Sequence, residues 1–196
     1  MSVSRETSER FQTFSDLAKK WNARINLFSK STEANFETRH ILDSRHVFSL
    51  SPTFSHWADL GTGGGFPGVV AAICAKDDAY DGRFTFVESD ARKATFLAEA
   101  VRILELKATV INERIETCPP LDADIISARA LAPLVQLCEY TLRHRKAGGT
   151  ALFPKGATYL NEVAEAKRTW HFDCKVHPSV THDDAVVLEL GSISRV

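Results

Sequence analysis

The sequence predicts an α/β fold built on a mostly parallel, seven-stranded sheet. From residue 56 onward, strand-like segments alternate with helical ones, and this alternation requires crossover connections between parallel strands. A glycine-rich turn follows the first of these strands, where doubly wound sheets bind nucleotide-like ligands. The last two strands are separated by a short polar turn, so we expect the sheet to end in an antiparallel C-terminal hairpin.

Residues 1–55 are predicted to form an N-terminal helical extension, distinct from a main domain at 56–196. The extension contains no glycine, and its one proline is Pro52. Apolar residues at intervals of three and four predict a first helix, which Ser4 or Thr7 would cap. A second helix is expected over 36–50. The apolar surface is too small for an independent domain, so these helices should pack on the main domain and cover its ligand-binding mouth.

In the main domain, each element is predicted from its apolar pattern. Strands are expected at 56–60, 83–88, 107–111, 123–127, 149–153, 170–176 and 185–190, with helices at 67–76, 91–105, 132–144 and 158–169. The pair Gly148-Gly149 is interpreted as a break before the fifth strand. The cations of Arg143-His144-Arg145-Lys146 are interpreted as the C-terminal end of a helix, where positive charge is favourable.

Composition excludes several classes of protein. No apolar run approaches the ~20 residues that cross a bilayer, and no signal peptide opens the sequence. The four cysteines are scattered, and no histidine stands at a zinc-ligand spacing, so no metal site is predicted. A net charge of −1 argues against coating nucleic acid through bulk charge. We expect a cytoplasmic, monomeric enzyme with no membrane partner.

The turn after the first strand carries most of the information about ligand binding. It reads Asp59-x-Gly61-x-Gly63-x-Gly65, an acid followed by three alternating glycines. Glycine allows a tight turn and a close approach of the ligand to the backbone. The dinucleotide fingerprint G-x-G-x-x-G would need glycine where Phe66 stands. The pattern is instead similar to the first motif of Rossmann-like class I methyltransferases, which bind S-adenosylmethionine.

Acidic residues near the first two strands are further candidates for this ligand. Glu88 ends the second strand, where an acid accepts hydrogen bonds from ribose hydroxyls in nucleotide-binding folds. Asp90 would take that role if the strand ends two residues later. Asp59 is expected either near the methionine end of the cofactor or as a brace for the loop.

Later strand ends supply the remaining candidates. Ile115 offers an apolar face and Glu116 an acceptor after the third strand, where adenine commonly packs. Arg129 follows the fourth strand; it is either a surface or ion-paired residue, or a clamp for a carboxylate or phosphate at the mouth. Lys155 follows the fifth strand and could reach RNA, although most lysines are only solvated.

Five segments resemble the sequence motifs of one family. They are Trp21-Asn22-x-x-Ile25-Asn26-Leu27, Arg39-His40-Ile41-Leu42-Asp43-Ser44, Gly61-Thr62-Gly63-Gly64-Gly65-Phe66-Pro67-Gly68, Ser127-Ala128-Arg129-Ala130 and Lys155-Gly156. In this order they are similar to the bacterial 16S ribosomal RNA guanine-N7 methyltransferases of the RsmG (GidB) type. The likeness runs from about residue 20 to 156.

The resemblance implies a cofactor, a substrate and roles for particular residues. The cofactor would be S-adenosylmethionine, lined by Gly61 and Phe66, with Ile115 and Glu116 beside the adenine. Arg129 would stand near the methionine or the acceptor. The partner would be 16S ribosomal RNA or the small ribosomal subunit. Its contacts would include Arg129, Lys155, Asn26, Arg39 and His40, although His40 and Asp43 could instead brace the packing of the extension.

The resemblance also implies a reaction without a catalytic acid or base. Guanine N7 has an in-plane lone pair and no proton, so the site has only to align the reactants and exclude water. Two alternatives stay open at this stage. One is a small-molecule methyltransferase, which would need an enclosed apolar pocket. The other is a non-catalytic RNA-binding module, against which the intact acid-and-glycine loop argues.

Overall fold

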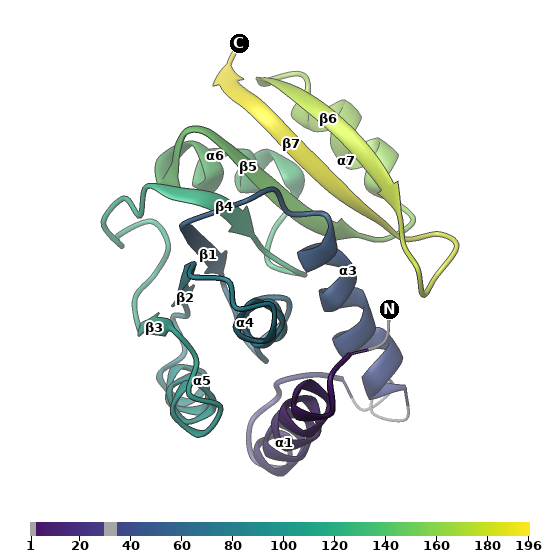
Figure 1. The fold of residues 1–196 in the computed structure, drawn as a ribbon. Helices are drawn as coiled ribbons and strands as arrows, with labels where there is room; N and C mark the ends of the chain where they lie inside the picture. The colour runs from purple at the N-terminus through teal and green to yellow at the C-terminus, as the bar shows by residue number, and fades with distance from the viewer. Residues whose placement is uncertain (1–2, 30–34) are drawn as a thin grey trace.

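The computed structural model describes residues 3–29 and 35–196 and has three layers (Figure 1). The central layer is a seven-stranded sheet in the order β3-β2-β1-β4-β5-β7-β6. Strands β1 (His56–Leu60), β2 (Arg83–Val87), β3 (Ala108–Ile111), β4 (Ala123–Ser127) and β5 (Arg145–Lys155) are mutually parallel. Strands β6 (Trp170–Pro178) and β7 (Val186–Arg195) form the antiparallel hairpin. The predicted fold class is confirmed.

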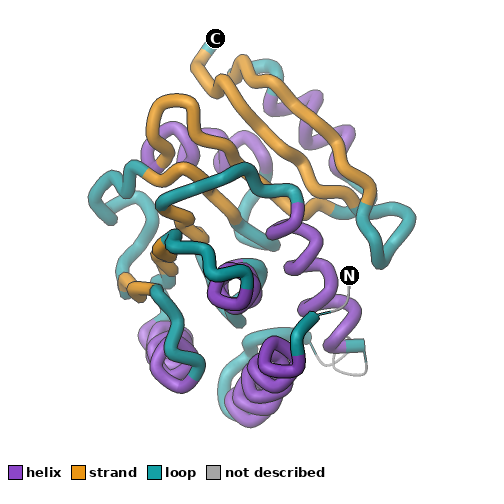
Figure 2. The backbone as a smooth tube through the Cα atoms, in the orientation of Figure 1, coloured by secondary structure: helices purple, strands orange, loops and turns teal. Residues whose placement is uncertain are grey.

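Helices cover both faces of the sheet (Figures 1 and 2). One face carries α4 (Gly68–Asp77) and α5 (Ala91–Ile103); the other carries α6 (Leu134–His144) and α7 (Tyr159–Ala166). Alternate residues of one strand serve the two faces, because successive side chains of a strand point in opposite directions. Trp57 packs with α4, whereas Ala58 packs with α6.

The N-terminal helices extend the layer of α4 rather than forming a layer of their own. Helix α1 (Arg5–Asn22) begins at Ser4, whose hydroxyl accepts a hydrogen bond from the Thr7 amide at 3.0 Å, so Ser4 is the cap. Phe14 of α1 is fully buried; its ring stacks on Phe96 and packs at a tilt against Phe66. Residues 1–55 and residues 56–196 thus share one core. The boundary between them at residue 55 stays a prediction.

Several predicted elements differ in detail from those observed; β7, for example, runs to Arg195 rather than to residue 190. The second N-terminal helix is a six-residue π-helix, η1 (Glu37–Leu42), followed by α3 (Asp43–Ser49). Strand β5 is eleven residues long and begins at Arg145, so Gly148 and Gly149 lie inside it rather than before it. The strand absorbs them because its pairing with β4 shifts between Ala123 and Ile125.

The basic cluster is correspondingly split between a helix and a strand. Helix α6 ends at His144, and Arg145 and Lys146 open β5. Arg145 donates to the carbonyls of Gly149 and Ile193 at 3.0 and 3.2 Å, which fastens the long strand to its neighbour β7. The interpretation of the cluster as a helix end holds for Arg143, His144 and the C-cap residue Arg145, and it is wrong for Lys146, which lies in the strand.

Candidate functional site

The glycine loop lies between β1 and α4, at the edge where the parallel strands end. Gly61 and Gly63 have φ values of +62° and +56°, a conformation that residues with a side chain rarely adopt. A Cβ on Gly61 would also lie 2.5 Å from Leu131 Cδ1. The Gly63 amide donates to Glu88 Oε2 at 2.8 Å, which ties the loop to the end of β2. This hydrogen bond therefore fixes the loop next to the carboxyl end of β2.

A pocket of about 260 Å³ lies over this loop. Its lining includes five predicted cofactor residues, which come from three strand ends: Gly61, Gly63, Glu88, Ile115 and Glu116. Glu116 accepts a hydrogen bond from the Tyr140 hydroxyl at 2.6 Å, and this bond lowers the pKa of the Glu116 carboxyl. The pocket thus combines three carboxylates and two cations with an apolar wall of Val87, Ile115 and Leu131; the charged residues are Glu88, Glu113, Glu116, Lys93 and Arg114.

Glu88 and Asp90, the two residues that the sequence offers as the ribose partner, have different surroundings. Glu88 lines the small pocket. Asp90 instead caps α5, accepting from the Arg92 amide at 2.8 Å, and pairs with the Arg92 guanidinium at the same distance. The Glu88 carboxylate also accepts from the Asp90 amide at 2.8 Å, so its position is fixed from both sides.

Asp59 lies beneath the loop and lines neither this pocket nor the larger cleft described next. Its carboxyl is fully buried and accepts a hydrogen bond from the Ser127 hydroxyl of β4, which in turn accepts from the Trp57 indole at 2.7 Å. Burial raises the pKa of Asp59 to about 7. Of the two roles predicted for Asp59, this position fits the brace.

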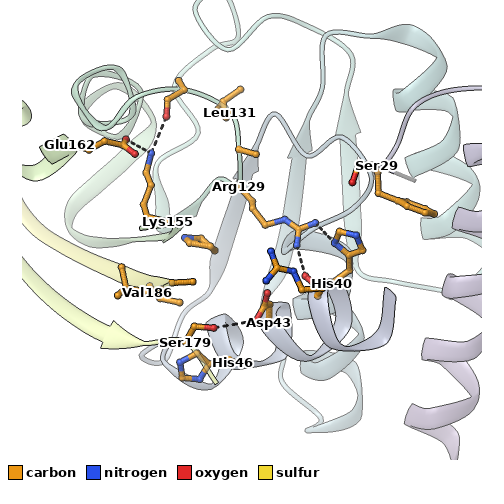
Figure 3. Close-up of a pocket in the computed structure, with 18 of the residues that line it drawn as sticks. Ser29, His40, Asp43, His46, Arg129, Leu131, Lys155, Glu162, Ser179 and Val186 are labelled. Atoms are coloured by element: carbon orange, nitrogen blue, oxygen red, sulfur yellow. Dashed lines mark hydrogen bonds and ion pairs between the residues drawn. The ribbon is translucent and has the colours of Figure 1, made fainter. Parts of the chain in front are cut away.

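A larger cleft of about 820 Å³ adjoins the small pocket (Figure 3). Its walls come from η1, α3, the β4–α6 loop, the end of β5, α7 and the C-terminal hairpin. They include Arg39, His40, Asp43, Arg129, Lys155, Glu162 and Val186. Lys155 Nζ binds Glu162 Oε2 at 2.7 Å and the Ala132 carbonyl at 3.1 Å. Lys155 therefore sits in the cleft wall with an ion-pair partner.

Arg129 enters the cleft above the ring of Phe66 and reaches η1. Its guanidinium carbon is 4.7 Å from the centre of that ring. It donates to the Arg39 carbonyl at 3.1 Å and to His40 Nδ1 at 2.9 Å (Figure 3). Burial lowers the pKa of Arg129 to about 10, which still leaves it charged at neutral pH.

Several predicted site residues lie away from the two cavities. Gly65 and Phe66 line neither one. A Cβ on Gly65 would lie 2.7 Å from Phe14, and the Phe66 ring is buried between α1 and η1. Asn26 is exposed in the turn after α1 and does not line the cleft. His40 lines the cleft, but its ring is buried and only 7% exposed.

The two cavities meet at Ala130 and Leu131, which line both. Sequence reasoning missed Leu131 and also Tyr140, the partner of Glu116. Leu131 follows the motif around Arg129 and fills the space that Gly61 leaves, so the motif could have pointed to it. No comparable signal marked Tyr140, whose ring is one of several apolar groups on α6.

The residues of the small pocket fit a nucleoside such as the adenosine part of S-adenosylmethionine. Carboxylates suit ribose hydroxyls and an amino group, and the apolar wall suits a purine ring. In the described part of the chain, no cluster of three or more His, Cys, Asp or Glu side chains could hold a metal ion. The described helices include none long and apolar enough to cross a membrane.

Solved methyltransferases share this fold. An S-adenosylmethionine-dependent methyltransferase from Aquifex aeolicus aligns with a TM-score of 0.61 over 89% of this chain and 97% of its own, at 15% identity. TYW2 from M. jannaschii, solved with AdoMet, aligns with a TM-score of 0.58 over 89% of this chain and 80% of its own, at 14% identity. The fold is therefore that of the class I methyltransferases.

Sequence comparison identifies the family within that class. The family model described as rRNA small subunit methyltransferase G matches residues 7–188. Proteins called ribosomal RNA small subunit methyltransferase G are 48% identical in Cereibacter sphaeroides and 44% identical in Gluconobacter oxydans. The alignments cover 100% and 99% of this chain, and 95% and 98% of the relatives. The chain belongs to the rRNA small subunit methyltransferase G family.

Proposed function

We propose that this protein transfers a methyl group from S-adenosylmethionine to N7 of a guanine in 16S ribosomal RNA. Membership of the family supports methylation of ribosomal RNA as the activity. The observation that carries the proposal is the pairing of a small nucleoside-sized pocket with a larger cleft, joined at Ala130 and Leu131. A base that enters the cleft can thereby meet a methyl donor that extends from the pocket.

The small pocket would hold the cofactor, which supplies an electrophilic methyl group. Glu88 would accept from the ribose hydroxyls, and Ile115 and Glu116 would contact the adenine. Gly61 and Gly63 would allow the cofactor to approach the backbone. Gly65, Phe66 and Asp59 would act from within the protein by shaping the loop, because Phe66 and Asp59 are buried and the Gly65 backbone packs closely against Phe14.

The larger cleft would hold the RNA and orient the target base. Orientation alone lowers a barrier by roughly 7–11 kcal/mol in favourable cases, and N7 needs no base to remove a proton. The product purine is cationic, so the carboxylates of Asp43 and Glu162 in the cleft would stabilise the charge that develops during transfer. Arg39 and Asn26 would contact the RNA on the side of the N-terminal helices.

The cleft also bears on the alternative of a small-molecule substrate. An enclosed apolar pocket would favour that alternative, whereas this cleft is lined by Arg39, Arg129 and Lys155 together with two carboxylates. These charged groups, set among apolar residues, suit a base and its phosphates within a larger RNA.

The test is methylation of purified substrates by the purified protein. Isotope-labelled S-adenosylmethionine is supplied with either naked 16S RNA or intact small subunits, and the RNA is digested to nucleosides for mass spectrometry. We expect label in 7-methylguanosine from at least one of the two substrates. Label in another nucleoside would overturn guanine N7 as the methylated position. Absence of label from both RNA samples would overturn 16S ribosomal RNA as the substrate.

A further inference from the structure

Arg129 is held at the cleft by two acceptors that are neighbours in the sequence. We infer that the Arg39 carbonyl and the His40 ring, both in the π-helix η1, form a clamp that fixes the direction of the Arg129 guanidinium. This inference rests on the proposed function and deepens it. It assigns His40, expected from the sequence as an RNA contact, the role of a positioning residue.

The two bonds of the clamp leave the guanidinium little freedom. Nη1 donates to the Arg39 carbonyl at 3.1 Å and Nη2 donates to His40 Nδ1 at 2.9 Å (Figure 3). Arginine has five N–H donors in one plane, so two bonds from different nitrogens set the direction of the whole group. The donors outside the clamp are then available to a carboxylate, phosphate or carbonyl oxygen in the cleft.

Packing holds the His40 ring in the orientation that the clamp needs. The ring stacks on Phe66 with centroids 4.7 Å apart and planes at 23°. The rings of Phe36 and Phe28 approach its other sides at 5.2 and 5.6 Å. Because Arg129 also lies over Phe66, one aromatic ring supports both members of the hydrogen bond.

The clamp requires Nδ1 to be unprotonated, and its surroundings keep it so. Burial, together with the positive charges of Arg129 and Arg39, lowers the pKa of His40 to about 3. Other charged groups on the packed elements are Asp43 in the same cleft and Lys19 of α1, whose ammonium lies 5.4 Å from the centre of the Phe36 ring. At neutral pH the ring therefore accepts a hydrogen bond from the guanidinium.

Both acceptors of the Arg129 guanidinium come from successive residues of the π-helix η1. Its wider turn is rare, occurs in short stretches and is frequent at functional sites. The Ser44 hydroxyl, at the start of α3, donates to the His40 carbonyl at 2.6 Å and so secures this turn. Figure 3 shows η1 lying along the cleft wall opposite Lys155.

The test is a double-mutant cycle on the rate of methyl transfer to small-subunit RNA. His40→Phe keeps a stacking ring and removes the acceptor, and Arg129→Ala removes the donor. We expect each to lower kcat/KM by about tenfold or more, as for a lost charge-assisted bond. The double variant should be no worse than Arg129→Ala, because the pair acts as one unit. His40→Asn, which retains an acceptor, should recover part of the rate.

His171→Phe is the matched control, since His171 is exposed on β6 and lines neither cavity. Activity of His40→Phe within twofold of the wild type would overturn the clamp. The clamp would also be overturned if the loss of kcat/KM in the double variant equalled the product of the losses in the two single variants.

A second measurement does not depend on activity. The ¹⁵N shifts of the His40 ring should show a neutral ring at pH 5 in the wild type and a raised pKa in Arg129→Ala, whatever the substrate is. If the His40 ring titrated at the same pH in Arg129→Ala as in the wild type, the clamp would be overturned. Absence of methyl transfer by the wild type would overturn only the proposed function.

Discussion

At the scale of single residues, the glycine loop and the strand end before it divide into residues that line the small pocket and residues that are buried in the core. Gly61 and Gly63 line the small pocket, whereas Phe66 and Asp59 lie behind it. The sequence places all four within eight residues but does not set which of them reach the pocket and which are buried. That direction depends on α1 and η1, which supply the rings around Phe66.

Asp59 gives a prediction about pH at this scale. Its pKa is raised from 3.8 to about 7, so the folded protein binds a proton that the unfolded chain releases between these values. The wild type therefore loses stability relative to Asp59→Asn as pH rises from about 4 to about 7, and the difference is constant above that range. Urea unfolding at pH 5 and pH 8 should show a relative loss of at least about 1 kcal/mol.

Asp183→Asn, in the exposed turn of the C-terminal hairpin, is the control for this measurement. A difference between wild type and Asp59→Asn that stays the same at both pH values would show that the Asp59 carboxyl is ionised in the folded protein.

At the scale of elements, apolar periodicity predicted all seven strands of the sheet, because strands and helices bury their faces at different intervals. The same periodicity could not predict that the helix over 36–50 begins as a π-helix. A six-residue stretch is too short for its apolar pattern to distinguish bonds from residue i to i+5 from those to i+4. Nor could it predict the length of β5. The pair Gly148-Gly149 predicts a break when only the local sequence is considered. In the structure, pairing with β4 and β7 keeps the strand continuous.

The glycine loop carries the prediction that belongs to this scale. Gly63→Asp should abolish binding of S-adenosylhomocysteine in calorimetry, because the residue has φ +56° and its amide is bound to Glu88. An added carboxylate would repel Glu88 and occupy the pocket. Gly191→Asp, in the middle of β7 where an added Cβ would meet no atom within 4 Å, is the matched control and should bind normally. Normal binding by Gly63→Asp would show that the cofactor lies elsewhere.

At the scale of the whole molecule, the site depends on contacts between distant parts of the chain. The strand-end residues Glu88, Ile115 and Glu116 could be predicted together, because the carboxyl ends of parallel strands meet at one edge. The meeting of Arg129 with Arg39 and His40 could not, since it joins residues about ninety positions apart through side-chain packing. Sequence motifs placed these residues in one family pattern without indicating that they bind one another.

The same dependence predicts that the main domain does not fold without the N-terminal helices. Phe14, Phe36 and Val47 of these helices lie in one hydrophobic cluster with Trp57 and Phe96 of the main domain. A fragment of residues 56–196 would expose the partners of these side chains along α4 and α5. We therefore expect it to lack a cooperative thermal transition and to bind a hydrophobic dye.

The full chain with Phe14→Ala measures one part of this packing. Because Phe14 is fully buried, its loss should lower the free energy of unfolding by about 3–5 kcal/mol in urea titrations. The variant should also weaken cofactor binding, since Phe14 supports Gly65 and Phe66 from below. If the fragment of residues 56–196 instead melts cooperatively near the melting temperature of the full chain, the main domain folds without residues 1–55. The N-terminal helices would then complete the cleft by docking onto a folded domain.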